Sequence, residues 1–257
     1  MDSELMNLKN TNLYNIFIPI SLEGLEVQTY KVPFASKEIK ENITIITSRP
    51  SKEEIINQAF KFHSLGNNSE AAKLYQHCIN KGTKDHRVFF NYATILKGLA
   101  KSEKAAEFYR KAIENKPDLA EAYLNLGFIL KELGQLKEAE EVTRKAIKIK
   151  PKYDKAYSNL GNILRDLGKL KEAEIVLRKA IEIKPDFAYA HFNLGNILRD
   201  LGNLQDAEVS LRKAIELEPN FTDACFNLSY LELLKGNYQD GLKNYEFRFK
   251  TKEPVLV

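Results

Sequence analysis

Asparagine recurs at a fixed spacing of 34 residues along most of this chain. The six copies, which we call the asparagine ladder, are Asn57, Asn91, Asn125, Asn159, Asn193 and Asn227. A period of this length is typical of solenoid proteins, in which each repeat is one supersecondary unit that buries its apolar face against its neighbours. The spacing therefore predicts a stacked array in which one amide side chain occupies the same place in every repeat.

Other positions keep the same register when the ladder asparagine is counted as the sixth residue of a repeat. The eighth and twentieth residues are small, the fifteenth is glycine in five of the six repeats, and the thirty-second is proline in the middle four. Apolar residues recur at helical spacing on both sides of the glycine. Glycine ends a helix and proline cannot continue one, so each repeat is predicted to be a pair of antiparallel helices. The repeats are 52–85, 86–119, 120–153, 154–187, 188–221 and 222–255.

The series Tyr157-x2-Leu160-Gly161-x2-Leu164, followed by Ala173-x3-Leu177-x2-Ala180 and Pro185, resembles the signature of the tetratricopeptide repeat (TPR). The tryptophan of the family's fourth position is absent from all six repeats. The resemblance covers residues 52–255. It implies an all-α, right-handed superhelical solenoid of six TPR hairpins that binds other proteins.

Residues 1–51 do not follow the period. They contain short strand-like pieces at 16–20, 27–32 and 43–46, separated by prolines. A segment of this size does not readily form a core by itself. We therefore expect a weakly structured N-terminal leader, 1–51, before the TPR array, 52–255.

The composition argues against several classes of protein. The net charge of +4 arises from 39 basic and 35 acidic residues that are mixed along the chain, so nucleic acid is not the expected partner. No apolar run is long enough to cross a bilayer, and the first residues lack the basic start of a secretory signal. The two cysteines fall in different repeats and imply no disulfide framework. We expect a cytoplasmic protein, with homo-oligomerisation through the outer face or the ends of the array as an open option.

The chemistry-bearing residues do not form a catalytic pattern. The four histidines and two cysteines have no metal-ligand spacing, and Cys78, Cys225 and His191 occupy repeat positions that normally lie in the core. No nucleophile elbow, phosphate-binding loop or dinucleotide fingerprint is present. The sequence therefore predicts no enzyme activity, no metal and no cofactor in these residues.

The asparagine ladder is the candidate binding site. A primary amide carries two donors and an acceptor, so it can pair with both the N–H and the C=O of an extended peptide. The ladder resembles that of the TPR domains of O-linked N-acetylglucosamine transferases. In those domains the asparagine at the sixth position faces the concave groove, and the groove binds the protein substrates. Aromatic residues at the neighbouring fifth and ninth positions are candidate side-chain contacts: Phe60, Phe90, Phe128, Phe192, Phe226 and Tyr230.

Each of these interpretations has a structural alternative. The asparagines also fit repeat duplication, and the aromatic residues also fit packing between repeats. The charged pairs Arg165/Asp166 and Arg199/Asp200 either tune partner choice or join neighbouring helices.

The last repeat suggests a second function. Gly241 replaces the usual alanine and Arg248 the usual small residue. This segment resembles the passage from a TPR array into a C-terminal glycosyltransferase-type domain. The alternative function is thus the substrate-recruiting part, or a truncated relative, of such an enzyme, whereas a capping helix explains the same residues without it.

Overall fold

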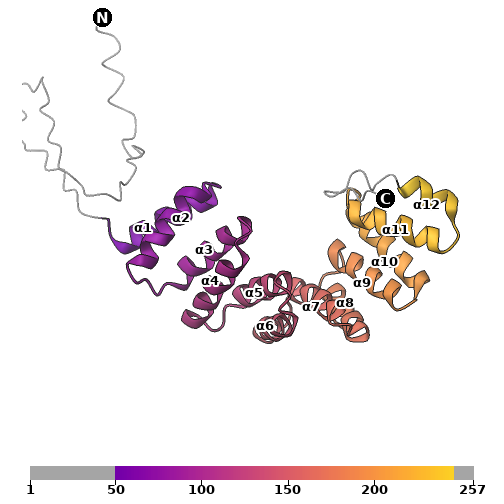
Figure 1. Ribbon diagram of the computed structural model, residues 1–257, viewed down its shortest axis with the longest axis horizontal. Helices are drawn as coiled ribbons and strands as arrows, with labels where there is room; N and C mark the ends of the chain where they lie inside the picture. The colour runs from indigo at the N-terminus through magenta and orange to yellow at the C-terminus, as the bar shows by residue number, and fades with distance from the viewer. Residues whose placement is uncertain (1–49, 246–257) are drawn as a thin grey trace, which may run out of the picture. The chain divides into compact units, whose positions relative to one another are not determined.

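The computed structural model describes residues 50–245, which contain twelve α-helices and no β-strand (Figure 1). In chain order they are α1 (Lys52–Ser64), α2 (Asn68–Asn80), α3 (His86–Gly98), α4 (Ser102–Asn115), α5 (Ala120–Glu132), α6 (Leu136–Ile149), α7 (Asp154–Asp166), α8 (Leu170–Ile183), α9 (Ala188–Asp200), α10 (Leu204–Leu217), α11 (Thr222–Leu234) and α12 (Tyr238–Tyr245). The predicted all-α array of helical pairs is confirmed. The expectations for residues 1–49 and 246–257 lie outside the described residues.

Glycine and proline set the helix boundaries. The first helix of the fourth repeat ends at Asp166, and Gly168 follows with a φ of 74°, a left-handed conformation that favours glycine. The turn is closed by the amide of Lys169, which donates to the carbonyl of Leu164 at 2.8 Å. The second helix ends at Ile183, two residues before Pro185. The same punctuation repeats along the array and produces its period.

The second repeat has Ala100 where the other turns have glycine, and its φ of 55° is positive. A residue with a side chain is strained in this left-handed region, so Ala100→Gly is expected to raise the free energy of unfolding. The expected net gain is about 0.5–1 kcal/mol, once the larger conformational entropy of glycine in the unfolded chain has been subtracted. Urea unfolding followed by circular dichroism measures the change. The reciprocal control is Gly134→Ala, where φ is 73° and nothing lies within 4 Å of the added methyl group. A neutral or lower stability of the Ala100 variant contradicts the expectation.

The core is continuous between neighbouring repeats. One cluster contains the fully buried Leu160, Leu164 and Leu177 of the fourth repeat together with Leu211 of the fifth. Small residues allow the two helices of a pair to approach closely, because a Cβ atom at Gly161 would lie only 2.6 Å from Leu177 Cγ. Each repeat therefore depends on its neighbours to bury its apolar surface.

The first helices of the third to sixth pairs also pack against one another. Besides its partner in the pair, α7 contacts both α5 and α9, and α9 contacts α11. This close approach defines one side of the array, formed by α1, α3, α5, α7, α9 and α11, which we call the inner face. The second helices form the outer face. The whole asparagine ladder is carried by the helices of the inner face.

None of the described helices has the length and apolar character that a bilayer-spanning helix needs.

Candidate functional site

A cavity of about 320 Å³ lies between the first two repeats. Phe60, His63 and Ser64 line it from α1, Tyr75 from α2 and Asn91 from α3. Phe60 occupies the ninth position of one repeat and Asn91 the sixth position of the next. The fold therefore brings a predicted aromatic contact and a predicted ladder amide to the walls of one cavity.

The walls of this cavity are neutral. Burial lowers the pKa of the His63 imidazole below its usual range, and burial, with a smaller contribution from Cys78, raises the pKa of Tyr75 far above its usual range. The Tyr75 hydroxyl lies 3.5 Å from His63 Nδ1. Charge enters at Phe60, whose ring centroid is 5.3 Å from the guanidinium carbon of Arg87. The cavity thus offers apolar and hydrogen-bonding surface with a cation nearby.

A second cluster on the inner face joins Lys97 of α3 to Asn125 and Phe128 of α5. Lys97 Nζ donates to Asn125 Oδ1 at 3.1 Å and lies 5.3 Å from the centroid of the Phe128 ring. Asn125 Nδ2 donates to the backbone carbonyl of Glu121 at 3.0 Å. Both polar atoms of this ladder amide are therefore already bonded, whereas 42% of Phe128 stays exposed.

The next two ladder residues are buried. Asn159 Nδ2 donates to the hydroxyl of Thr143 at 3.3 Å, and Asn193 Nδ2 donates to the hydroxyl of Ser158 at 3.1 Å. Each pair links consecutive repeats, and Thr143 and Ser158 are themselves buried. These two asparagines therefore join repeats together.

The ends of the ladder differ from its centre. Asn227 Nδ2 donates to Asn196 Oδ1 at 2.8 Å, which again links two repeats. Asn57 is exposed and Asn91 is half-buried, and within residues 50–245 neither side chain makes a hydrogen bond. Only these two ladder amides thus have their donors and acceptor available within the described chain.

The six predicted aromatic contacts fall into two groups. Phe60, Phe90, Phe192 and Phe226 are half-buried, and each contacts another ring of the array in a tilted or edge-on arrangement. The centroids of Phe192 and Phe221, for example, are 4.8 Å apart. Phe128 and Tyr230 are exposed, Tyr230 by 47%. Packing within the array accounts for the first group, although Phe60 also lines the cavity described above.

Charged residues near the ladder join neighbouring first helices. Arg165 Nε lies 2.6 Å from Asp200 Oδ2, and Lys131 Nζ lies 3.0 Å from Asp166 Oδ2. Of the two interpretations of these charged pairs, ion pairing between neighbouring helices is confirmed. Pairs as exposed as these contribute little to stability.

Sequence reasoning missed four members of the site. The residues that bond a ladder amide of the following repeat are Lys97, Thr143, Ser158 and Asn196. A signal for Asn196 was present. The ten residues 193–202 are identical to residues 159–168, and both stretches have an asparagine at the ninth position of the repeat, Asn162 and Asn196. A signal for Lys97 was also present, because Lys131, Arg165 and Arg199 stand at the same repeat position, whereas Thr143 and Ser158 have no counterpart that repeats along the ladder.

The expectations for the cysteines and for His191 have different outcomes. Cys78 and Cys225 are buried, as predicted. His191 is only half-buried: its Nε2 is 2.9 Å from the carbonyl oxygen of Pro185, and its side chain lines a second cavity on the outer face. The prediction that it lies in the core is therefore wrong. In residues 50–245, no three histidine, cysteine or acidic side chains are grouped so that they could hold a metal ion.

Gly241 has a packing reason of its own. A Cβ atom there would lie 2.8 Å from the side chain of Leu233, which stands where the four preceding repeats have lysine or arginine. Close approach of α12 to α11 thus explains the glycine. Arg248 lies outside the described residues, so a C-terminal glycosyltransferase-type domain stays a prediction.

The geometry defines the class of protein, which is a solenoid of stacked helical pairs. Tetratricopeptide-repeat family models match residues 86–119, 108–141, 161–198 and 188–221. Two of these matches, 86–119 and 188–221, coincide with repeats of the asparagine ladder, and the chain is a tetratricopeptide-repeat protein. No curated protein matches it.

Solved structures share the fold. The TPR protein YrrB, whose structure is described as having an unusual peptide-binding site, is 26% identical, with 68% of this chain and 91% of YrrB aligned at a TM-score of 0.53. A tetratricopeptide-repeat protein of Parabacteroides merdae is 19% identical, with coverage of 79% and 81% and a TM-score of 0.67. MamA of Desulfovibrio magneticus is also 19% identical, with coverage of 65% and 97% and a TM-score of 0.57. The last two show the fold alone.

Proposed function

We propose that the inner face of the first repeats binds extended segments of partner proteins. TPR arrays are protein-interaction scaffolds, and the peptide-binding site of YrrB supports this role for a related fold. The proposed role is that of a scaffold and involves no catalytic step.

The cavity between the first two repeats carries the proposal. It combines an aromatic wall from Phe60 with the unbonded amide of Asn91, and Asn57 lies one helical turn before Phe60 on α1. The two amides pair with the backbone of an extended segment, and the cavity receives one of its apolar side chains. This division of roles matches general peptide recognition, in which backbone bonds supply affinity and pockets supply specificity.

The central ladder residues contribute differently. Because one Nδ2 hydrogen of each of Asn159, Asn193 and Asn227 is bonded inside the array, these amides have less hydrogen-bonding capacity left for a bound peptide than Asn57 and Asn91, and the oxygen is their main free acceptor. A segment that continues along the inner face would donate its N–H groups to these oxygens. The pairing of both backbone groups, expected from the sequence at every ladder position, is thus proposed for Asn57 and Asn91, whose amides make no hydrogen bond within the described residues.

Magnitudes limit the affinity. Two amides that make two hydrogen bonds each supply about 2–4 kcal/mol at a net value near 1 kcal/mol per bond. One buried apolar side chain adds about 1.5–3 kcal/mol. Ordering each peptide residue costs about 1–2 kcal/mol. These contributions together stay below the roughly 8 kcal/mol of a micromolar complex. We therefore expect at best micromolar affinity for segments with an apolar anchor, and nanomolar binding by a short peptide would contradict this account.

The test compares a double asparagine-to-alanine variant of the site with a single asparagine-to-alanine control outside it. Peptides selected from a random library on the wild-type protein are expected to bind Asn57→Ala/Asn91→Ala about tenfold more weakly or worse, because about 1.4 kcal/mol of hydrogen bonding is lost. Fluorescence anisotropy with labelled peptides measures the dissociation constant. The control variant is Asn220→Ala, which changes an exposed asparagine in the loop after α10 and is expected to leave binding unchanged.

Two results count against the proposal. One is that selection on the folded wild-type protein enriches no peptide. The other is that the selected peptides bind the Asn57/Asn91 variant as tightly as the wild type while its circular dichroism and unfolding curve are unchanged.

A further inference from the structure

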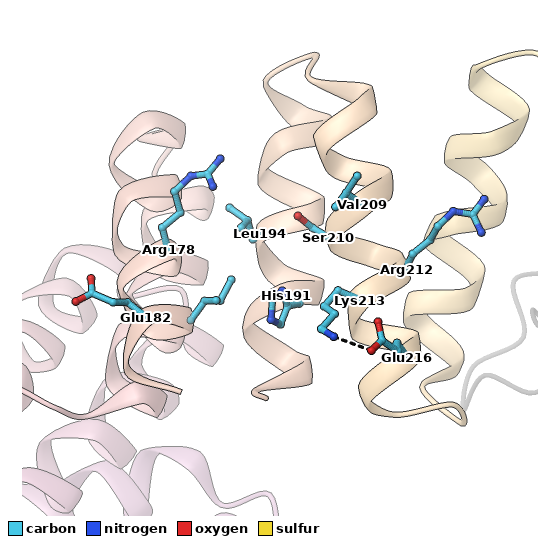
Figure 2. Close-up of a pocket in the computed structure, with 10 residues that line it drawn as sticks. Arg178, Glu182, His191, Leu194, Val209, Ser210, Arg212, Lys213 and Glu216 are labelled. Carbon is cyan, nitrogen blue, oxygen red and sulfur yellow. Dashed lines mark hydrogen bonds and ion pairs between the residues drawn. The ribbon is translucent and has the colours of Figure 1, made fainter. Parts of the chain in front are cut away.

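The outer face has a cavity of about 630 Å³ between α8 and α10, above α9 (Figure 2). Ile181 lines it from α8, His191 and Leu194 from α9, and Val209 and Ser210 from α10. We call this part of the outer face the α8–α10 seam. No residue of the asparagine ladder lines the cavity, so the seam is separate from the proposed peptide site.

Three sequence changes open this seam relative to the preceding one between α6 and α8. His191 replaces the larger Tyr157, and Ser210 replaces Val176 at the same repeat position. In the preceding seam Arg144 bridges to Glu172 of the next repeat, whereas the equivalent Arg178 pairs with Glu174 of its own helix. The residue equivalent to Glu172 is the shorter Asp206. The opening thus distinguishes this seam from the preceding one.

The same seam exposes aliphatic side chains. Ile175 of α8 is 68% exposed and Val209 of α10 is 61% exposed. The equivalent residues of the first three repeats are charged: Lys73, Glu107 and Glu141. An apolar surface beside an unfilled cavity, both confined to the fourth and fifth repeats, indicates an interaction surface.

The charges around the cavity indicate what covers it. Arg178 and Arg212 stand at the same repeat position on α8 and α10, and Glu182 and Glu216 follow one turn later on the same helices. Each row is paired within the chain: Arg178 and Arg212 with Glu174 and Glu208, and Glu182 and Glu216 with Lys179 and Lys213, the last of which Figure 2 marks. Two rows of arginine and glutamate one turn apart are complementary to the same rows turned through 180°, once these pairs exchange partners.

We propose that a second copy of this chain covers the α8–α10 seam in an isologous dimer. In this dimer the two seams lie antiparallel. Ile175 and Val209 of each copy cover the cavity of the second copy. Arg178 of each copy faces Glu182 of the second copy. In the single chain these charges form exposed pairs within their own helices, Arg178 with Glu174 and Lys179 with Glu182. Such pairs are weak and exchange partners at small cost.

Sedimentation velocity over a wide range of concentration tests the proposal on the full chain. The wild type is expected to form a dimer in a concentration-dependent way, and Val209→Glu is expected to weaken dimerisation by about tenfold or more because it places a charge in the apolar contact. Val209 is exposed, so this change leaves the fold intact. Glu107→Lys, at the equivalent position of α4, is the matched control and is expected to leave dimerisation unchanged.

Charge reversal tests the antiparallel arrangement. Arg178→Glu and Glu182→Arg are each expected to weaken the dimer because they bring like charges together across the two-fold axis. The double variant Arg178→Glu/Glu182→Arg restores opposite charges and is expected to recover dimerisation. A wild type that is monomeric at every concentration overturns the proposal. So does a Val209→Glu variant that dimerises like the wild type, or a double variant that shows no recovery.

Discussion

Replacing Gly161 by valine is expected to lower the free energy of unfolding by about 3 kcal/mol, because the site has no room for a side chain. A Cβ atom at this position would lie 2.6 Å from Leu177 Cγ and 2.8 Å from Leu177 Cδ2. Leu177 is fully buried and packs in a cluster that also contains residues of the next repeat, so it has little space in which to move. Strain at this contact therefore acts on the packing of two repeats.

A double-mutant cycle identifies the contact responsible. Leu177→Ala alone is expected to cost about 2–5 kcal/mol, since it leaves a cavity in the core. In Gly161→Val/Leu177→Ala the valine occupies part of that cavity. The double variant is thus expected to be more stable than the sum of the two losses implies, by at least about 1 kcal/mol.

Urea unfolding followed by circular dichroism measures all three variants. Lys171→Ala, on the exposed side of α8, is the control and is expected to stay within about 0.5 kcal/mol of the wild type. Strict additivity of the two core changes would show that Gly161 and Leu177 do not constrain each other.

The double variant Asn159→Ala/Asn193→Ala is expected to lose about 2–4 kcal/mol of stability, because two buried hydrogen bonds disappear and their partners are left behind. Asn193 is 7% exposed, and its amide bonds the buried hydroxyl of Ser158. Asn159 is linked in the same way to Thr143. Thermal and urea unfolding measure the loss.

The matched control for the ladder is Asn57→Ala. This residue stands at the same repeat position but is exposed, so its change is expected to alter stability by less than about 0.5 kcal/mol. Equal stability losses for central and terminal ladder residues would contradict the division of the ladder that the hydrogen bonds indicate. The same division is the reason why a binding test should change Asn57 and Asn91, whose removal leaves the contacts between repeats intact.

Much of the fold follows from sequence by physical rules that act locally. Gly168 ends α7 because its left-handed backbone suits a helix C-terminus, and Pro185 follows the end of α8 because a helix cannot continue through it. The period of the repeats then implies the stacking, since a single helical pair cannot bury its apolar face alone. These features need only neighbouring residues, and the sequence by itself determined them.

The site depended on contacts that no local pattern contains. Six identical asparagines differ in role because Asn193 meets Ser158 and Asn125 meets Lys97, whereas Asn57 faces solvent. The exchange of Val176 for Ser210 in the next repeat is unremarkable in sequence, yet together with His191 it opens a cavity. Hydrogen bonds and packing between repeats depend on which side chains face each other across about one period, and only the tertiary structure decided that pairing.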